Sequence, residues 1–407
     1  MSEVFDVVIV GGGPVGLALA AALGQGLQGE ARIAVIGGAR PIDPAGDPRA
    51  VAIAGGSMAL LRSLGVWPRI EHEAEPVVGI DITDSSLDAG VRPVVLSYEN
   101  VLDDGTAATA IVPLALVHGA LHEVARSTAG VVLLDGSLAL VHFDDLAARL
   151  TLDDGRIVSA RLAVGADGRR SRLREAAGIG IVERDYRQVG IVTVVAHELP
   201  HRGRAVQHFL PSGPFAMLPM KGDRSCITWT ETADEGRRIL ALDDAAFLAE
   251  VDRRFGGRLG DLTLAGGRRS WPLAMHLSRA YVANRLALAG DAAHGVHPIA
   301  GQGLNLGFRD VAALAEVIAD TARLGLDVGL TTTLQRYERR RRADSALSAG
   351  VFDRLQWLFA NDNPALRAVR DSGMAVVDRL PALKRFLVAE AAGLTGEVPR
   401  LLRGEPL

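Results

Sequence analysis

Residues 7–24 read VVIVGGGPVGLALAAALG, an uncharged run that decides the fold. The β-branched residues 7–10 predict a strand, the glycines after them a tight turn, and residues 17–23 a helix. Residues 33–36, IAVI, predict a second strand. A strand, a helix and a strand in this order form a β-α-β unit, which implies an α/β fold with a parallel sheet and helices on its faces.

The same run is nearly long enough for a membrane-spanning helix. However, glycines and Pro14 interrupt its middle, and the acidic residues Glu3 and Asp6 precede it. A spanning helix needs about 20 predominantly apolar residues, and a signal peptide begins with basic residues. We therefore predict neither a membrane span nor a signal peptide here.

Gly11, Gly13 and Gly16 form a G-x-G-x-x-G motif between the first strand and the helix. Gly11 allows the tight turn, Gly13 lets the backbone approach a pyrophosphate, and Gly16 permits close packing of the helix on the sheet. The free amides and the positive dipole end of the helix favour bound phosphate. The motif in this context predicts a dinucleotide-binding site.

The composition limits the class of protein. The chain has 407 residues and a net charge of −4, so it is long enough for two or three domains and lacks the basic excess of a nucleic-acid-binding protein. Cys226 is the only cysteine, which excludes an internal disulfide and favours a reducing, cytoplasmic environment. His294 and His297 are three residues apart, but no third ligand is evident, so we predict no metal site.

Two further predicted strands lead into loops that can carry chemistry. Residues 162–164 run into GADG at 165–168, and residues 286–289 run into GDAAHGVHPIAGQGLN at 290–305. Between these two loops, residues 186–272 form short apolar or alternating segments separated by turns, which is typical of an antiparallel sheet. The sequence after residue 334 is mostly helical in pattern. We therefore expect one nucleotide-binding domain assembled from separated segments.

The three motifs, in this order and spacing over residues 4 to about 345, resemble those of the single-component FAD-dependent aromatic hydroxylases. The chain is most similar to the hydroxylases of ubiquinone biosynthesis, with matching segments DPRAVAI at 47–53, SLGVW at 63–67, residues 286–318, and AAGLTGEVPRLLRG at 391–404.

This resemblance implies a Rossmann-like FAD-binding domain built from discontinuous segments, an inserted antiparallel β-sheet substrate domain and a C-terminal helical region. We set the boundaries at 1–75, 106–185 and 273–345 for the FAD-binding domain, at 76–105 and 186–272 for the substrate domain, and at 346–407 for the C-terminal helices.

The resemblance also implies which residues bind the cofactor. The positions that match the family's motifs are Gly11, Gly13 and Gly16 at the pyrophosphate, Arg49 near the pyrophosphate and flavin, Asp167 and Gly168 for FAD and the nicotinamide cofactor, Asp291 at a ribityl hydroxyl, and Pro298, Gly301, Gln302, Gly303, Leu304 and Asn305 along the isoalloxazine ring. Residues 300–303 precede a helical pattern, so their amides lie at a helix N-terminus, where they can stabilise the negative charge of reduced flavin.

Two positions depart from the family's pattern. Gly37 and Gly38 follow the second strand, where a carboxylate usually binds the adenosine ribose. Residues 114–118, LALVH, occupy the place where the family usually has a polar residue and an arginine. Both departures remove polar side chains that would contact FAD.

The resemblance implies an enzyme that hydroxylates a phenolic ring, in particular a polyprenylated ubiquinone precursor. NAD(P)H would be a transient reductant that transfers hydride to FAD, and the reduced flavin would react with O₂ to form a flavin hydroperoxide. The sequence singles out no catalytic side chain. Two alternatives stay open: a flavin-poor accessory or lipid-binding subunit of the same pathway, and a flavoenzyme that acts on another aromatic or prenyl substrate.

A prenylated substrate resides in the bilayer, so the resemblance also implies peripheral contact with the inner face of the membrane and other ubiquinone-biosynthesis enzymes as partners. The C-terminal region offers apolar residues for such a surface, namely Leu355, Trp357, Leu358, Phe359, Leu366 and Phe386. Packing of these helices on the rest of the protein explains the same pattern equally well. The arginine run at 339–342 is typical of an exposed helix face paired with Glu338 and Asp344.

Overall fold

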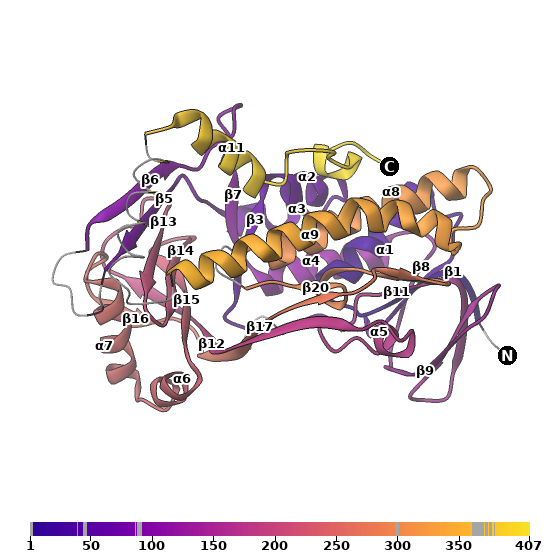
Figure 1. Cartoon of the computed structure of the whole chain (residues 1–407), viewed down its shortest axis with the longest axis horizontal. Coiled ribbons are helices and arrows are strands. Elements are labelled where there is room, and N and C mark those ends of the chain that lie inside the picture. The colour runs from indigo at the N-terminus through magenta and orange to yellow at the C-terminus, as the bar shows by residue number, and fades with distance from the viewer. Residues whose placement is uncertain are drawn as a thin grey trace.

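The computed structural model contains three β-sheets with helices packed around them (Figure 1). It describes residues 3–38, 40–43, 47–85, 87, 92–297, 301–359, 370, 373, 377 and 379–407. Pro298 and Leu366 lie outside these described residues.

Sheet A confirms the parallel sheet predicted from the N-terminal sequence. Its strands, in spatial order, are β18 (Val282–Ala283), β19 (Leu286–Leu288), β11 (Ile157–Gly165), β1 (Glu3–Val10), β2 (Ile33–Ile36) and β8 (Val131–Leu134), with β10 (Ala148–Leu152) paired to β11 and β9 (Leu138–Phe143) paired to β10. The five strands from β19 to β8 run parallel. Because β1, β11 and β19 lie side by side, the three loops that follow them meet at one edge of the sheet.

Three helices pack together beside sheet A: α1 (Pro14–Gly26), α4 (Leu114–Ser127) and α8 (Gly303–Arg323). The predicted helices at 17–23 and 304–318 are therefore confirmed as parts of α1 and α8. Every residue of α1 from 16 to 24 is buried, because its sequence is apolar on all sides. The short elements around these helices are α2 (Gly55–Ser63), α3 (Trp67–Ile70), η2 (Glu71–Glu73), α5 (Arg172–Ala176) and η3 (Gly290–Ala292).

Sheet C confirms the antiparallel sheet expected for residues 186–272. Its strands, in spatial order, are β20 (His294–Gly295), β17 (Arg269–Ser278), β12 (Ile181–His197), β15 (Arg224–Thr232), β14 (Gly213–Met220), β13 (Arg204–Leu210), β5 (Gly79–Asp84) and β6 (Val94–Glu99), with β16 (Leu262–Leu264) beside β12. β5 joins the sheet by pairing in parallel with β13. Sheet B is small and consists of β3 (Ala50–Ala54), β7 (Thr109–Pro113) and β4 (Glu75–Pro76). The proposed residue boundaries of the domains stay a prediction.

The two faces of sheet C are covered differently. One face packs against α6 (Ala233–Leu240) and α7 (Asp244–Phe255), where Phe215, Met217 and Trp229 are buried with Phe247. We call this the outer face. The opposite, inner face points toward sheet B and toward α9 (Thr331–Phe359), the long helix that crosses the molecule in Figure 1.

Some of the apolar side chains near the C-terminus pack in the interior, and others are exposed. Phe359 is buried with Phe209 of sheet C, and Leu355 and Leu358 pack beside it, so the packing alternative holds for these three residues. Trp357 and Phe386, the latter in α11 (Pro381–Ala391), remain about 60% exposed. The last element, η5 (Arg400–Arg403), buries its leucines in the core of sheet A. None of the described helices is both long enough and apolar enough to span a bilayer.

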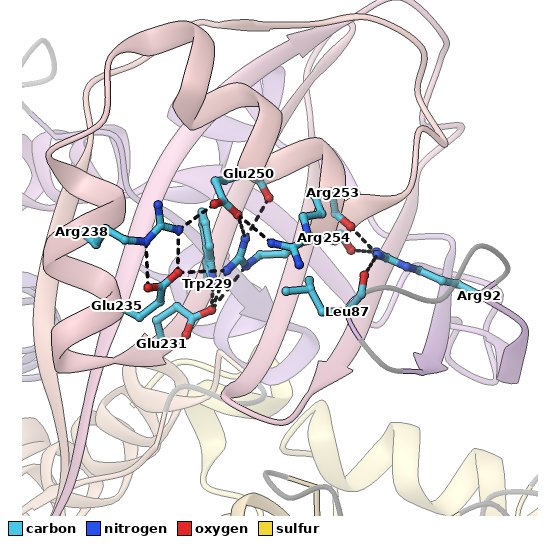
Figure 2. Close-up of polar contacts among 9 residues, drawn as sticks. All are labelled: Leu87, Arg92, Trp229, Glu231, Glu235, Arg238, Glu250, Arg253 and Arg254. Carbon is cyan, nitrogen blue, oxygen red and sulfur yellow. Dashed lines mark hydrogen bonds and ion pairs between the residues drawn. The ribbon is translucent and has the colours of Figure 1, made fainter.

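A buried charge cluster fixes α6 and α7 on the outer face of sheet C (Figure 2). The Arg254 guanidinium donates to Glu231 Oε1 at 3.0 Å and to Glu250, and its carbon lies 4.2 Å from the centre of the Trp229 ring. Trp229 Nε1 donates to the same Glu231 oxygen at 3.2 Å. The side chains of Arg254 and Glu231 are both at most 5% exposed, so each charge depends on the other for compensation.

We expect the Arg254→Met substitution to lower the free energy of unfolding by about 3 to 5 kcal/mol, because it leaves Glu231 buried without its cation. Urea denaturation measures this change. Arg238→Met is the matched control, since Arg238 contacts Glu235 and Glu250 but is half exposed, and its substitution should cost much less. Equal losses in the two variants would contradict a special role of the buried pair.

Candidate functional site

The three predicted motifs lie next to one another at the carboxyl edge of sheet A. Val10 pairs with Gly165, and Gly165 pairs with Leu288, so the loops after β1, β11 and β19 begin side by side. The buried Arg174, which follows the second motif, donates to the Ala292 carbonyl oxygen of the third motif at 2.9 Å. Ligands of open parallel sheets bind at this edge.

The first loop requires its glycines for different reasons. Gly11 has φ +119°, and a Cβ there would lie 2.1 Å from the Ala166 carbonyl oxygen. A Cβ on Gly16 would lie 2.0 Å from the Gly11 carbonyl oxygen. A Cβ on Gly13, in contrast, would meet no described atom within 4 Å, so the backbone of Gly13 is open to a ligand. Gly13 caps α1 without any side-chain hydrogen bond, which leaves the first amides of the helix available to an anion.

The second motif places an unpartnered oxygen at the same edge. Asp167 Oδ2 accepts a hydrogen bond from the Arg172 amide at 2.8 Å, while the buried Oδ1 has no partner among the described residues. Gly168 follows with φ +78°. A buried carboxylate oxygen without a donor is costly, and a cofactor hydroxyl or amide would satisfy it.

The third motif is held by a buried carboxylate that the sequence analysis missed. Asp310 of α8 accepts hydrogen bonds from the Gly290 amide at 2.9 Å, from His294 Nε2 at 2.6 Å and from Arg341 Nε at 2.7 Å. Burial raises the pKa of Asp310, but His294 and Arg341 outweigh it, so the net shift is downward and the carboxyl is ionised. The only signal in the sequence is an acidic residue inside an otherwise apolar helix pattern.

The same contacts correct the interpretation of the arginine run. Arg341 is buried against Asp310 and also contacts Asp344, so one member of the run lies in the interior rather than on an exposed face.

Asp291, the residue predicted to bind a ribityl hydroxyl, is exposed on η3, and its backbone carbonyl accepts a hydrogen bond from His276 Nε2 at 2.7 Å. Its carboxylate therefore faces away from the buried network and is accessible to a ligand.

The loop before α8 confirms the expected helix N-terminus. α8 begins at Gly303 with Gln302 as its cap, and neither Gly303 nor Leu304 is buried. Asn305 Oδ1 accepts from the Ala54 amide at 3.0 Å and Asn305 Nδ2 donates to the Ala52 carbonyl oxygen at 2.8 Å. The side chain of Asn305 thus binds strand β3 and holds the start of α8 against sheet B. Gly301 has φ +62° and a Cβ there would lie 3.5 Å from Ala52 Cβ.

Arg49 lies just before β3 and is partly neutralised. Its Nε donates to Asp47 Oδ1 at 2.8 Å, and its guanidinium carbon lies 5.2 Å from the centre of the Trp271 ring. Burial raises the pKa of Asp47, but hydrogen bonds from Arg49 lower it further than burial raises it. The Arg49 guanidinium therefore lies between Asp47 and Trp271 of β17, and its contact with FAD stays a prediction.

His118 occupies the region where the family's polar anchors are absent. Its Nε2 lies 2.8 Å from the Gly12 carbonyl oxygen, and its Nδ1 lies 3.2 Å from the Ile42 amide nitrogen. An amide can only donate, so Nδ1 accepts and Nε2 carries the proton that is donated to Gly12. Burial lowers the pKa of His118, which favours this neutral form. His118 thereby joins the glycine loop to the segment after β2, next to Gly37.

We expect the His118→Phe substitution to weaken FAD binding about thirtyfold, because two hydrogen bonds that position the glycine loop are lost at about 1 kcal/mol each. Flavin fluorescence during titration of the apoprotein measures the dissociation constant. His122→Phe, one turn along the same helix, is the control and should leave it unchanged. An unaltered dissociation constant in His118→Phe would show that the loop is ordered without this bridge.

Residues 4–348 match the family model described as FAD binding domain. The chain is 43% identical to the ubiquinone hydroxylase UbiL of Rhodospirillum rubrum, over 100% of this chain and 94% of that protein. It is 34% identical to the 3-demethoxyubiquinol 3-hydroxylase of Escherichia coli, over 96% of this chain and 98% of that protein. Among solved structures, p-nitrophenol 4-monooxygenase of Pseudomonas putida has the same fold, with a TM-score of 0.80, 21% identity, and 98% and 100% of the two chains covered.

Three features fit an FAD molecule along the edge of sheet A: the open Gly13 backbone, the N-termini of α1 and α8, whose caps make no side-chain hydrogen bond, and the oxygen of Asp167 without a partner among the described residues. This geometry agrees with the match to the FAD-binding family model and with the two similar hydroxylases. The chain belongs to the FAD-dependent hydroxylases of ubiquinone biosynthesis.

Proposed function

We propose that this protein is a monooxygenase that hydroxylates the aromatic ring of a polyprenylated ubiquinone precursor with FAD, NAD(P)H and O₂. Two relatives that match nearly the whole chain are named as a ubiquinone hydroxylase and as 3-demethoxyubiquinol 3-hydroxylase. Bound FAD supplies the redox chemistry, because it takes hydride from NAD(P)H and activates O₂ for transfer of one oxygen atom. The chain's own residues bind the cofactor and the ring and exclude water.

The observation that carries the proposal is the inner face of sheet C. Along β14, Phe215 and Met217 are buried on the outer face, whereas the alternating Ala216 and Leu218 on the inner face remain partly exposed. Leu218 packs near Ala52 of β3, the strand that Asn305 ties to the N-terminus of α8. A mostly apolar, incompletely covered surface thus lies close to the turn expected to face the flavin, as an aromatic substrate requires.

The cofactor residues predicted from the sequence belong to the same proposal. The backbone of Gly13 and the first amides of α1 would hold the pyrophosphate, and the exposed carboxylate of Asp291 would accept a hydrogen bond from a ribityl hydroxyl. The first amides of α8, at Gly303 and Leu304, would stabilise negative charge on the reduced flavin ring. The glycine loop and these amides would contact the cofactor through backbone groups. The absence of polar side chains at Gly37 and Leu114 therefore leaves these contacts in place.

We also propose peripheral docking on a membrane, through the exposed apolar residues near the C-terminus. Trp357 is 60% exposed and Phe386 is 58% exposed, and the cationic Lys384 and Arg385 are adjacent to Phe386 in α11. Aromatic side chains with neighbouring cations are typical of surfaces that bind anionic lipid. Such a surface would bring the protein to a prenylated substrate and to other enzymes of the same pathway.

Hydroxylation is tested with purified protein, FAD, NADH or NADPH, ¹⁸O₂ and a phenol that carries a short prenyl chain. We expect one ¹⁸O atom in the ring, detected by mass spectrometry, and oxidation of about one NAD(P)H per product. The same phenol without its prenyl chain is the control and should show a KM at least about tenfold higher, since each buried methylene contributes about 0.8 kcal/mol. If NAD(P)H oxidation is coupled to hydroxylation only with the unprenylated phenol, the assignment of a prenylated substrate is wrong.

Docking is tested by sedimentation with vesicles of phosphatidylcholine and phosphatidylglycerol. We expect the double substitution Trp357→Asp and Phe386→Asp to weaken vesicle binding by tenfold or more, since each large apolar side chain contributes about 1.5 to 3 kcal/mol when buried. Leu146→Asp and Leu324→Asp, at residues 79% and 70% exposed, are the matched control and should have no effect. Equal vesicle binding by both double variants would contradict the assigned surface.

A further inference from the structure

His297 is a buried histidine whose ring has no hydrogen-bond partner among the described residues. It is 1% exposed, and neither Nδ1 nor Nε2 is bonded. The buried His208 and His276 each use one ring nitrogen, on Thr83 Oγ1 at 2.6 Å and on the Asp291 carbonyl oxygen at 2.7 Å. Most buried polar side chains in proteins have at least one partner, so two unpartnered nitrogens on one ring point to a binding role.

The place of His297 in the fold is at the junction of three elements. It follows β20 and lies four residues before Gly301, in the segment that leads to the N-terminus of α8. Its ring meets Tyr186 of β12 edge to face, with centroids 4.9 Å apart and an interplanar angle of 86°. The hydroxyl of Tyr186 donates to Asp353 of α9 at 3.0 Å. The ring therefore packs on sheet C, against a tyrosine that is bonded to α9.

Polar side chains of β12 near Tyr186 bond to α9. Asp353 accepts from Tyr186 and, at 2.7 Å, from Arg184, so both β12 side chains are held by α9. One turn further along α9, Gln356 Nε2 donates to Gln188 Oε1 at 3.0 Å. The buried Gln356 Oε1 has no partner among the described residues. The ring of His297 thus packs against a tyrosine that α9 holds, and both of its buried nitrogens remain without a hydrogen-bond partner among the described residues.

Given the proposed function, we propose that His297 binds the phenolic hydroxyl of the substrate, accepting its hydrogen bond and so setting which ring carbon faces the flavin. A hydroxyl that donates to an acceptor enriches the ring in electron density, which favours attack at the carbons ortho and para to it. A single fixed hydrogen bond in a largely apolar site also fixes the orientation of a flat ring.

The protonation state of His297 agrees with this role. Burial lowers the pKa of His297 to about 4, although Asp353 acts in the opposite direction. The ring is therefore neutral near pH 7, with one nitrogen that donates and one that accepts. A protonated imidazole would have no lone pair for the substrate hydroxyl.

The test compares two ligands and two proteins. The ligands are a prenylated phenol and the analogue in which hydrogen replaces its hydroxyl, and their dissociation constants come from the change in the flavin absorption spectrum. The wild-type protein should bind the phenol at least about tenfold more tightly than the analogue, because a site built around a hydroxyl rejects a ligand without one. In His297→Phe this ratio should fall close to one, while the analogue still binds.

His208→Phe is the matched control, because His208 is also buried but points to the outer face. Its neighbours on the same side of β13, Val206 and Leu210, pack in the core of that face. It should keep the wild-type ratio. A preserved ratio in His297→Phe would overturn the inference while leaving the proposed hydroxylation intact. Failure of the wild-type protein both to bind and to hydroxylate the prenylated phenol would instead overturn the proposed function, and the inference with it.

Should His297→Phe not retain FAD, the wild-type protein still decides the question. Its histidines are labelled with ¹⁵N, and His297→Asn identifies the His297 signals by their loss. We expect these signals to shift when the phenol is added and to shift much less with the analogue. Signals that respond to FAD binding but not to the phenol would assign His297 to the cofactor and overturn the inference.

Discussion

The buried carboxylate of Asp310 organises the site, since three separate parts of the chain bond to it. It fixes the start of the third motif through the Gly290 amide, the following strand through His294, and α9 through Arg341. Removing any of these donors would leave charge or polar atoms buried without compensation. Because α9 also carries Asp353 and Gln356 to β12, the position of Asp310 determines where the inner face of sheet C lies relative to the turn before α8.

The cofactor site itself uses backbone more than side chains. Gly11 and Gly16 are needed for packing, and Gly13 is needed for access, so the three glycines of one motif have distinct physical tasks. Two side chains position the loops around the site through bonds to backbone groups. His118 bonds to Gly12 and Ile42, and Asn305 bonds to Ala52 and Ala54. In the proposed site, the carboxylate that Gly37 replaces would be one contact among many.

The sequence predicted the parts of the structure that depend on local pattern. The β-α-β start and the helix after Gly303 follow from hydrophobic periodicity, whereas the common edge of the three loops is known only from the strand order of sheet A. It did not predict the pairing of Asp310 with Arg341, which lie 31 positions apart in sequence and meet only because of the relative rotation of α8 and α9. The bond from Asn305 to the Ala54 amide joins residues 251 positions apart, and no local pattern encodes such a contact.

The two faces of sheet C differ: the outer face packs in a hydrophobic core, and the inner face is the one proposed to bind the substrate. The outer face is closed by α6 and α7, with Trp229 buried and the Arg254–Glu231 pair shielded from water (Figure 2). The inner face keeps small or polar residues such as Ala216 and Thr228 only partly covered. In a strand, adjacent side chains point to opposite faces, so the same strands can anchor the domain rigidly on one side and present a binding surface on the other. Rigidity on the outer face thereby holds the inner face in register with α9 and His297, which an oriented aromatic ring requires.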